Sequence, residues 1–333
     1  MHNIILKITE LISLATLLVI SSPTYATSPP NTLTVTPAGA ALGFTLTPII
    51  TNIPIFGNIG PSSAIAAKNG DILTIDGNSD LIRVYTNSDK ANGSKLKSSH
   101  NVVGSIGTQL ASLNGTIYGR TNLTPSTGNI IQLNDNGTVA KTIATNIPAG
   151  YPLVAAPALN SLLFGSDLGN AGLGQNGFFL ITAPNGGTPY NSLNPAPQFY
   201  NISNDPIGGT FNMYFDNCSE SIYAEAISNL ERFALSNATL THNLELYMEG
   251  SPWDGGAYGI GKIGGNSSLY GKFVISNRYD LIILNPNTNE RTTILTGGNY
   301  EQGRLTPHSD GSLLIPAGNS VFKLRCGNGC SFQ

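Results

Sequence analysis

The sequence predicts an all-β protein, a six-bladed β-propeller, and three observations support this prediction. The chain has 38 glycines and 20 prolines, while charged residues make up only 11% of it, a composition typical of many short strands joined by tight turns. Beyond the first thirty residues, no segment of ten or more carries the apolar spacing of an amphipathic helix. The third observation is an internal repeat of the size of a propeller blade.

The repeat is a polar turn followed by two aliphatic or aromatic residues, and it occurs six times at intervals of 44 to 60 residues. A second apolar strand follows each copy, and usually a polar turn and one more strand come after it. Each unit therefore supplies an inner strand, two middle strands and an outer strand, which together make one blade. A solenoid is the weaker alternative, because β-helix repeats are usually shorter. The first apolar residues of the repeats are Ile72, Ile117, Leu162, Ile222, Leu269 and Leu313.

The two ends of the chain are predicted to meet in the last blade. The sixth unit stops without an outer strand of its own, whereas residues 43–52 resemble the outer strand at residues 141–146. An N-terminal strand in this position would pair an open sheet edge. We therefore expect a single propeller domain over residues 43–333, preceded by a lead-in at residues 27–42. The extra residues of the longest repeat are placed in a loop at residues 184–204.

The first 26 residues are predicted to be a cleaved signal peptide. An apolar run from Leu11 to Ile20 is followed by small residues at Thr24 and Ala26, which suit cleavage before Thr27. This run is too short to cross a bilayer as a stable helix, so the protein is not expected to span a membrane. An uncleaved anchor is the alternative. The prediction places the protein outside the cell or in the periplasm.

The three cysteines fit an oxidising compartment. Cys326 and Cys330 flank a glycine-rich spacer and are predicted to form a small disulfide loop, while Cys218 is predicted to be a buried thiol. The formal net charge is only −3, and the basic residues are scattered along the chain. Nucleic acid is therefore not an expected partner.

The repeats resemble those of the six-bladed calcium-dependent phosphotriesterase superfamily, which includes gluconolactonases and strictosidine-synthase-like proteins, with NHL-repeat and virginiamycin B lyase propellers nearby. The resemblance implies a divalent metal in the channel, held in part by the Glu of a Glu-Gly-Pro motif. Here the corresponding place reads Ile59-Gly60-Pro61, without the acid. Asp254, in Pro252-Trp253-Asp254-Gly255, resembles a second motif, but no further acid follows it. A weak Ca or Mg site is therefore conceivable but not favoured, and no cofactor is predicted.

The candidate site is the channel mouth where the inner strands begin, because the loops between blades converge there. Trp253, Asp254 and Tyr258 would combine an aromatic face with a carboxylate, which suits a sugar or another flat polar ligand. The alternative for Trp253 is packing between blades. Glu301 and Arg304 follow on the sixth inner segment.

This second group would supply a base from Glu301, an anion clamp from Arg304 and a proton shuttle from His308. The alternative is a solvated rim with one salt bridge. Asn212 belongs to the fourth inner strand, near Asp216. The acids around that strand are open to cation binding, but turn capping is the preferred interpretation.

Three functions remain open from the sequence. The leading hypothesis is a monomeric propeller that binds a small molecule, a carbohydrate or a protein ligand at its channel mouth. The alternative is a gluconolactonase-like hydrolase or lyase with a degenerate metal site. The third is a structural or host-surface interaction protein that uses the blade sides and the loop at residues 184–204.

Overall fold

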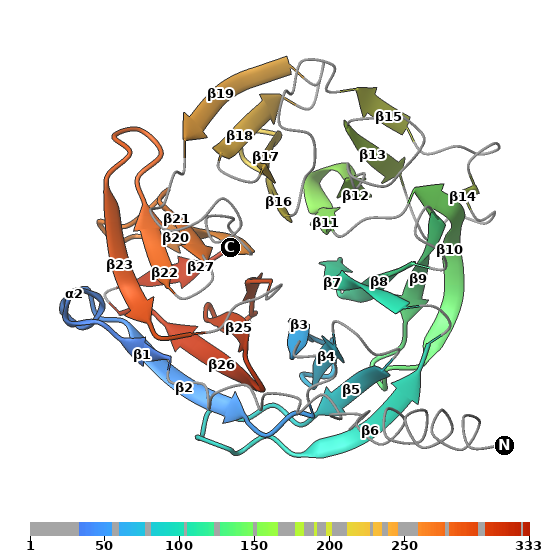
Figure 1. The fold of residues 1–333 in the computed structure, drawn as a ribbon, viewed down its shortest axis with the longest axis horizontal. Helices are drawn as coiled ribbons and strands as arrows, with labels where there is room; N and C mark the ends of the chain where they lie inside the picture. Colours follow the sequence, from blue (N-terminus) through green and yellow to red (C-terminus); the bar gives the residue numbers. More distant parts are fainter. Residues whose placement is uncertain are drawn as a thin grey trace, which may run out of the picture.

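The computed structural model describes most of the chain after residue 32. The described residues are 33–54, 60–76, 81–102, 105–122, 127–148, 152–165, 177–182, 190–191, 198–201, 212–226, 229–234, 239–245, 259–276, 280–298, 304–327 and 329–333. Their strands form sheets arranged in a ring around a central axis (Figure 1). The predicted β-propeller is confirmed.

The first three sheets follow one another along the chain, each listed here from its innermost strand outward. Sheet 1 contains β3 (Pro61–Ala66), β4 (Ile72–Asp76), β5 (Leu81–Tyr85) and β6 (Leu96–Asn101). Sheet 2 contains β7 (Ser105–Leu113), β8 (Thr116–Asn122), β9 (Thr127–Leu133), β10 (Val139–Pro148) and β14 (Tyr190–Asn191). Sheet 3 contains β11 (Leu153–Ala156), β12 (Ser161–Gly165), β13 (Gly177–Thr182) and β15 (Gln198–Asn201), with a short 3-10 helix at Pro157–Leu159.

The remaining sheets complete the ring, and the last two include strands from the chain ends. Sheet 4 contains β16 (Asn212–Asp216), β17 (Ser221–Ala226), β18 (Asn229–Ala234) and β19 (Thr239–Glu245). Sheet 5 contains β27 (Cys330–Phe332), β20 (Gly259–Gly265), β21 (Phe273–Ser276), β22 (Leu281–Leu284), β23 (Arg291–Thr296) and β1 (Thr34–Val35). Sheet 6 contains β24 (Thr306–Pro307), β25 (Leu313–Ala317), β26 (Ser320–Arg325) and β2 (Thr45–Ile50).

The predicted ring closure is confirmed. Strand β2 pairs antiparallel with β26, with Thr45 opposite Arg325, and so completes sheet 6. The predicted count of six equivalent blades is not confirmed. Five sheets have four strands of at least four residues each, but the inner strand β24 of sheet 6 has only two. Proline at Pro307 removes a backbone donor at this position, which limits the ladder.

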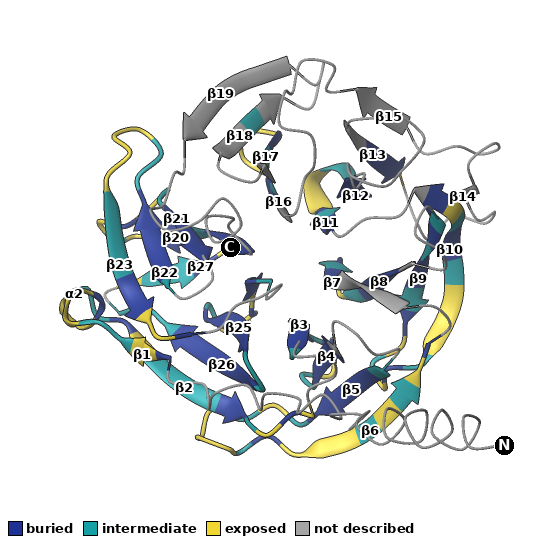
Figure 2. Ribbon diagram, viewed as in Figure 1, coloured by how far each residue is buried: buried dark blue, intermediate teal, exposed yellow. Residues whose placement is uncertain are grey.

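Each junction between neighbouring sheets holds its own apolar cluster, and together these clusters form the core. Ile82 of sheet 1 and Leu133 of sheet 2 share one cluster, for example, and Ile50 of sheet 6 and Ile72 of sheet 1 share another. The middle strands are therefore buried on both faces, while the outer strands are more exposed (Figure 2). This packing makes every sheet depend on two neighbours for burial of its apolar faces.

Two local predictions from the repeats were wrong. Leu269 does not enter a strand, because the turn after β20 continues through Gly271, whose φ is +78°, and β21 begins only at Phe273. The stretch at residues 184–204 is not simply a loop. It contains β14, which pairs with β10, and β15, which completes sheet 3.

A short helix was not expected and lies in the predicted lead-in. Helix α2 (Pro37–Ala41) begins after Thr36, whose hydroxyl accepts a hydrogen bond from the Gly39 amide at 3.0 Å. A Cβ at Gly39 would lie 2.4 Å from the carbonyl oxygen of Ile294, so this close contact with β23 requires glycine. In the described part of the chain, no helix has the length and apolar character needed to span a membrane.

Candidate functional site

A cavity of about 460 Å³ lies on the ring axis, between inner strands of several sheets. It is lined by the ends of β3, β7, β11 and β16, by residues 304–307, and by Ser309 and Gln333. These are the ends of the inner strands and the turns after them. The described cavity therefore extends toward the side opposite the mouth predicted from the sequence, most of whose loops lie outside the described residues.

Arg304 joins the inner strands of several sheets across this cavity. Its backbone amide donates to the carbonyl oxygen of Ser62 in β3 at 2.8 Å. Its guanidinium Nη1 donates to Gln109 Oε1 in β7 at 2.6 Å and to the carbonyl oxygen of Leu153 in β11. The side chain therefore starts in the last sheet of the chain and reaches the second and third.

Gln109 fixes the position of this guanidinium. The buried Gln109 side chain uses the same Oε1 to accept a hydrogen bond from the Leu153 amide at 2.8 Å. One amide oxygen thus binds both Arg304 and the start of β11. Because its acceptor is fixed on two sides, Nη1 has little freedom to move.

The charge of Arg304 has no carboxylate beside it among the described residues. The two groups that accept from its guanidinium are an amide and a backbone carbonyl, and both are neutral. Burial lowers the pKa of Arg304 to about 10, so the guanidinium stays charged at neutral pH. Within the described part of the chain, Nε and Nη2 have no hydrogen-bond partner, and an arginine offers five donors in all.

Asp216 is the one acidic residue in the described lining, and it is already paired. Its Oδ2 lies 2.7 Å from Lys262 Nζ of β20 and accepts from the Ser219 hydroxyl at 2.8 Å. Its Oδ1 accepts from the Cys218 amide at 3.1 Å. Burial alone would raise the pKa of Asp216, but the bonds from Lys262, Ser219 and Cys218 hold it below its usual value. The predicted turn capping is thus present, together with an ion pair that the sequence did not indicate.

Tyr214 also lines the cavity and lies two residues before Asp216 on β16. Its ring packs edge-on against Phe273 at 6.1 Å, across the junction of sheets 4 and 5. Burial, with a smaller contribution from the Asp216 charge, raises the pKa of the Tyr214 hydroxyl. The hydroxyl is therefore protonated at neutral pH and available as a hydrogen-bond donor.

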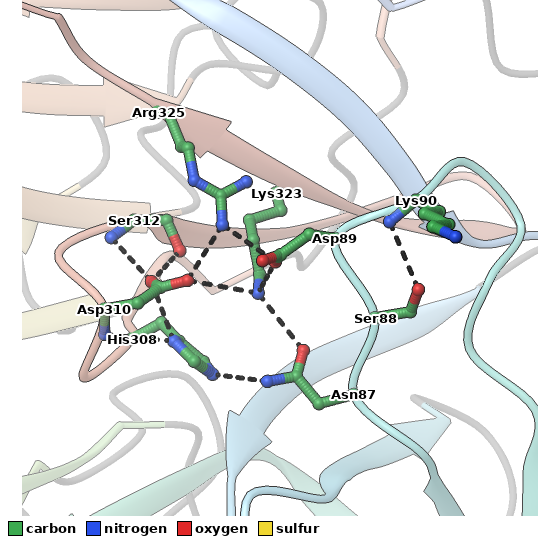
Figure 3. Close-up of polar contacts among 9 residues, drawn as sticks. All are labelled: Asn87, Ser88, Asp89, Lys90, His308, Asp310, Ser312, Lys323 and Arg325. Atoms are coloured by element: carbon green, nitrogen blue, oxygen red, sulfur yellow. Dashed lines mark hydrogen bonds and ion pairs between the residues drawn. The ribbon is translucent and has the colours of Figure 1, made fainter.

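His308 does not join Arg304 in the cavity lining. The buried His308 ring belongs to a polar network between sheets 6 and 1 (Figure 3), where its Nδ1 lies 2.8 Å from Asp310 Oδ1 and its Nε2 lies 3.3 Å from Asn87 Nδ2. The structure thus separates the predicted anion clamp from the predicted proton shuttle. Pro307 and Ser309 line the cavity, whereas the His308 side chain between them contacts Asn87 and Asp310, so residues only four apart reach different regions.

We call this network the closure network. It consists of Asn87 and Asp89 of the β5–β6 loop, His308, Asp310 and Ser312 around β25, and Lys323 and Arg325 of β26 (Figure 3). Lys323 Nζ lies 2.8 Å from Asp89 and 3.3 Å from Asp310, and Arg325 contacts the same two carboxylates at 2.8 and 3.0 Å. The charges of the two carboxylates and the two cations therefore neutralise each other, and the network serves to connect sheets 6 and 1.

The other predicted site residues are not placed by the structure. Trp253, Asp254, Tyr258 and Glu301 lie outside the described residues. Asn212 is the first residue of β16, and its side chain is not described. Their roles remain predictions.

The cysteine predictions had mixed outcomes. Cys326 and Cys330 form the predicted disulfide, with their Cα atoms 5.7 Å apart. Cys218, predicted to be buried, is exposed and lines the cavity, because it lies in the turn after β16 rather than in the strand.

The residues described around the channel do not fit the divalent metal that the family resemblance implies. At the place of the family's acidic ligand the chain has Ile59, whose side chain offers no oxygen atom. Within the described ranges, no three His, Cys, Asp or Glu residues gather in a way that would hold an ion. We therefore route no chemistry through a metal.

Sequence reasoning missed Gln109 and Lys262, which contact Arg304 and Asp216 of the cavity lining. Gln109 and Arg304 are 195 positions apart, and Lys262 and Asp216 are 46 apart. Each pair comes from two different sheets. Only knowledge of the register of the inner strands would have brought these residues together.

Known proteins match this chain in structure but not in sequence. No protein-family model and no curated protein sequence matches the chain. Among solved structures, a proposed gluconolactonase superimposes with a TM-score of 0.63 at 10% identity, over 90% of this chain and 99% of that one. An enzyme of carbohydrate-active family AA12 from Trichoderma reesei, in a calcium structure, gives 0.59 at 12% identity, over 92% and 100%. Virginiamycin B lyase from Staphylococcus aureus gives 0.51 at 12%, over 85% and 100%.

These comparisons define the class of the protein as a β-propeller of the kind found in several enzymes. More particularly, the predicted resemblance to gluconolactonase-like and virginiamycin B lyase-like propellers is confirmed at the level of the fold. At such low identity the likeness carries the fold alone, and the function must come from the residues of the channel.

Proposed function

We propose that the protein is a hydrolase or lyase that binds a small substrate in its central channel and uses Arg304 to hold a negatively charged oxygen of that substrate. The observation that carries this proposal is the charge balance of Arg304. The guanidinium is fixed in the cavity by neutral acceptors, and two of its nitrogens have no partner among the described residues. A fixed, half-buried cation interacts with an anion more strongly than a fully solvated one does.

The same cation would serve either reaction. In hydrolysis of an ester or lactone, the carbonyl oxygen gains negative charge as water adds to the carbon, and Arg304 would stabilise that oxygen. In an elimination, a base takes a proton beside a carboxylate and the leaving group departs with its electron pair, and Arg304 would stabilise the negative charge that the carboxylate gains in between. The neutral Tyr214 hydroxyl, on the cavity lining, would add a hydrogen bond to the substrate.

Binding without turnover is the second candidate, and the state of Asp216 favours it. This acid is paired with Lys262, and its pKa is low, so it is a weak base. The described lining therefore offers an anion-binding group but no other carboxylate to take a proton. Turnover would then need a base from the part of the channel mouth that is not described, and Glu301 is the predicted one.

The test uses the mature protein and a panel of small carboxylates, esters and lactones. Binding is followed by calorimetry and thermal shift, and turnover by release of acid. Arg304→Met should reduce the affinity, or kcat/KM, about a hundredfold, which corresponds to about 2.7 kcal/mol. Arg291→Met is the control, because Arg291 lies on the outer strand β23 and bonds Asn289 at 3.1 Å.

The outcomes separate the candidates. Binding and turnover that both depend on Arg304 support the enzyme. Binding that depends on Arg304 without turnover of any substrate supports the second candidate. If Arg304→Met binds every ligand as well as the native protein does, both are wrong.

We also propose that the protein is secreted after removal of residues 1–26. The disulfide supports this, since such bonds persist in oxidising compartments. Mass spectrometry of the protein from its own host should find a chain that begins at Thr27. A chain that begins at Met1 would contradict the proposal.

A further inference from the structure

Strand β27 occupies an unusual position in the ring. It pairs antiparallel with the inner edge of β20, with Phe332 opposite Ile263 and Cys330 opposite Gly265. Strand β27 is therefore the innermost strand of sheet 5, next to the channel, and the C-terminal residue lies inside the ring (Figure 1). Gln333 follows directly and contributes to the lining of the cavity.

The contacts of this segment connect two sheets at the side of the cavity. The Phe332 amide donates to the carbonyl oxygen of Gly311, in the turn between β24 and β25, at 3.0 Å. The Gln333 amide donates to the carbonyl oxygen of Lys262 in β20 at 2.9 Å. The buried Phe332 ring lies 6.4 Å from the ring of Phe44 in a shared core. These bonds hold the segment beside the ends of the inner strands.

The sequence of β20 leaves space for this docking. A Cβ at Gly265 would lie 2.2 Å from the carbonyl oxygen of Gly329, and a Cβ at Gly264 would lie 2.1 Å from Gln333 Nε2. The Gly329 carbonyl belongs to the backbone, so a side chain at Gly265 would displace the segment, whereas Gln333 could turn its side chain away from one at Gly264. Two consecutive glycines thus match the path of β27 on β20.

The disulfide ties the entry to this strand. Cys326 directly follows β26, and Cys330 is the first residue of β27. The bond closes a loop of five residues, so it restricts the segment when β27 is undocked more than when it is docked. Loss of the bond should raise the undocked fraction roughly thirtyfold, by the loop-closure entropy of so short a loop.

We propose that residues 329–333, tied to the end of β26 by the disulfide, are a redox-controlled plug of the channel. With the disulfide formed, β27 closes one side of the cavity. A dithiol reductant would transfer two electrons and two protons, which converts the bond into two thiols and the reductant into a disulfide. Strand β27 then leaves β20 more often, and the cavity opens on that side. This inference does not depend on the role of Arg304.

The test is hydrogen exchange followed by mass spectrometry on the native protein and on Cys326→Ser/Cys330→Ser. Exchange at residues 263–265, which pair with β27, and at residues 329–333 should rise roughly thirtyfold in the double variant. Exchange in β4 should not change, because this strand pairs with β3 and β5 and not with β27. Cys218→Ser, with the disulfide intact, is the matched control and should exchange like the native protein.

Phe332→Ala provides a second route to the same state. It keeps the disulfide but removes the buried ring, so the same residues should exchange faster. If the double variant does not fold, native protein with and without a dithiol replaces it. The proposal is overturned if exchange at residues 329–333 rises less than threefold without the disulfide, or if β4 speeds up by the same factor.

Discussion

The molecule holds positive charge in two contrasting ways. In the closure network, Lys323 and Arg325 each contact two carboxylates, those of Asp89 and Asp310. In the channel, Arg304 contacts only an amide and a carbonyl among the described residues. The first arrangement is complete without any other molecule, while the second leaves a charge that an anion can neutralise. Cations paired with carboxylates thus mark the network that stabilises the ring, and a cation without such a partner marks the site that can bind an anion.

The two regions also differ in what they join. The closure network connects the β5–β6 loop of sheet 1 to β26 of sheet 6, beside the place where the chain ends meet. The same loop donates from Asn92 and Ser94 to the backbone of β2, at 2.8 and 3.2 Å. Arg304, in contrast, spans the axis.

Deletion of residues 1–52 should have the largest effect. It removes β2 with the buried Leu33, Phe44, Ile49 and Ile50, at a cost of about 6 kcal/mol or more. This is comparable to the whole stability of a typical domain. The truncated protein should show no cooperative melting by circular dichroism, whereas deletion of residues 1–26 should leave the midpoint unchanged. A cooperative transition in the longer deletion would show that the ring does not need its N-terminal strand.

Lys323→Met should break the closure network. Lys323 is 1% exposed, so its loss leaves two carboxylates with less compensation. Since Asp89 is 64% exposed and partly solvated, we expect a loss of about 2 kcal/mol, less than for a fully buried pair. Denaturant unfolding measures it. Lys97→Met is the matched control, because Lys97 is 48% exposed in its pair with Asp71 and should cost under about 1 kcal/mol. Equal losses would contradict the structural role of the network.

Gln109→Glu should make the channel resemble the closure network. The new carboxylate would lie against Arg304 in place of an amide oxygen that is now 2.6 Å away. Affinity for small carboxylates should fall about tenfold or more, while the melting temperature should stay the same or rise. Gln109→Leu adds no charge and should have a smaller effect on affinity, through poorer positioning of Arg304. Unchanged affinity in Gln109→Glu would mean that anions bind elsewhere.

Acid should weaken the closure network by a smaller amount. Hydrogen bonds from Lys323 and Arg325 lower the pKa of Asp89. Burial alone would raise the pKa of Asp310, but hydrogen bonds from Ser312 and the adjacent His308 outweigh it, so the net pKa lies below the ordinary value. Both carboxylates therefore stabilise the folded state above their ordinary pKa of 3.8, and this contribution is lost as the pH falls below it.

We expect the loss at low pH to be about 1 kcal/mol, because solvent screens these groups. Unfolding measured between pH 7 and pH 3 should reveal it. Asp310→Asn should be less stable at pH 7 and should depend less steeply on pH. The same slope in both proteins would assign the acid sensitivity to other groups, such as Asp216, whose pKa is also lowered.

The fold was largely predictable, because the same apolar pattern occurs six times along the chain at intervals of the size of a blade. Ile72, Ile117 and Ile222 each lie at or next to the start of a second strand, and residues 43–52 supply the closing strand. The exceptions came from particular residues. The turn through Gly271 displaced one strand, and β27 carries no pattern that separates it from a tail.

The site was less predictable. Arg304 was found because it lies on an inner segment, but its acceptor Gln109 belongs to another sheet. The separation of His308 from Arg304 depends on the His308 side chain contacting Asp310 and Asn87 instead of the cavity, which no local pattern specifies. Spacing along a strand indicates which residues share a face. It does not indicate which residues of distant strands meet at the axis.

The pairing of β2 with β26 has a consequence for synthesis of the protein. Ile50 leaves the ribosome about 270 residues before Val321, its partner in the sheet. At roughly 5 to 20 residues per second, the N-terminal strand waits between about 13 and 55 seconds without its neighbour. During that interval its apolar side chains and open backbone groups are accessible to other nascent chains. Synthesis of β26 is therefore the step that covers the open edge of β2 and protects this strand from aggregation.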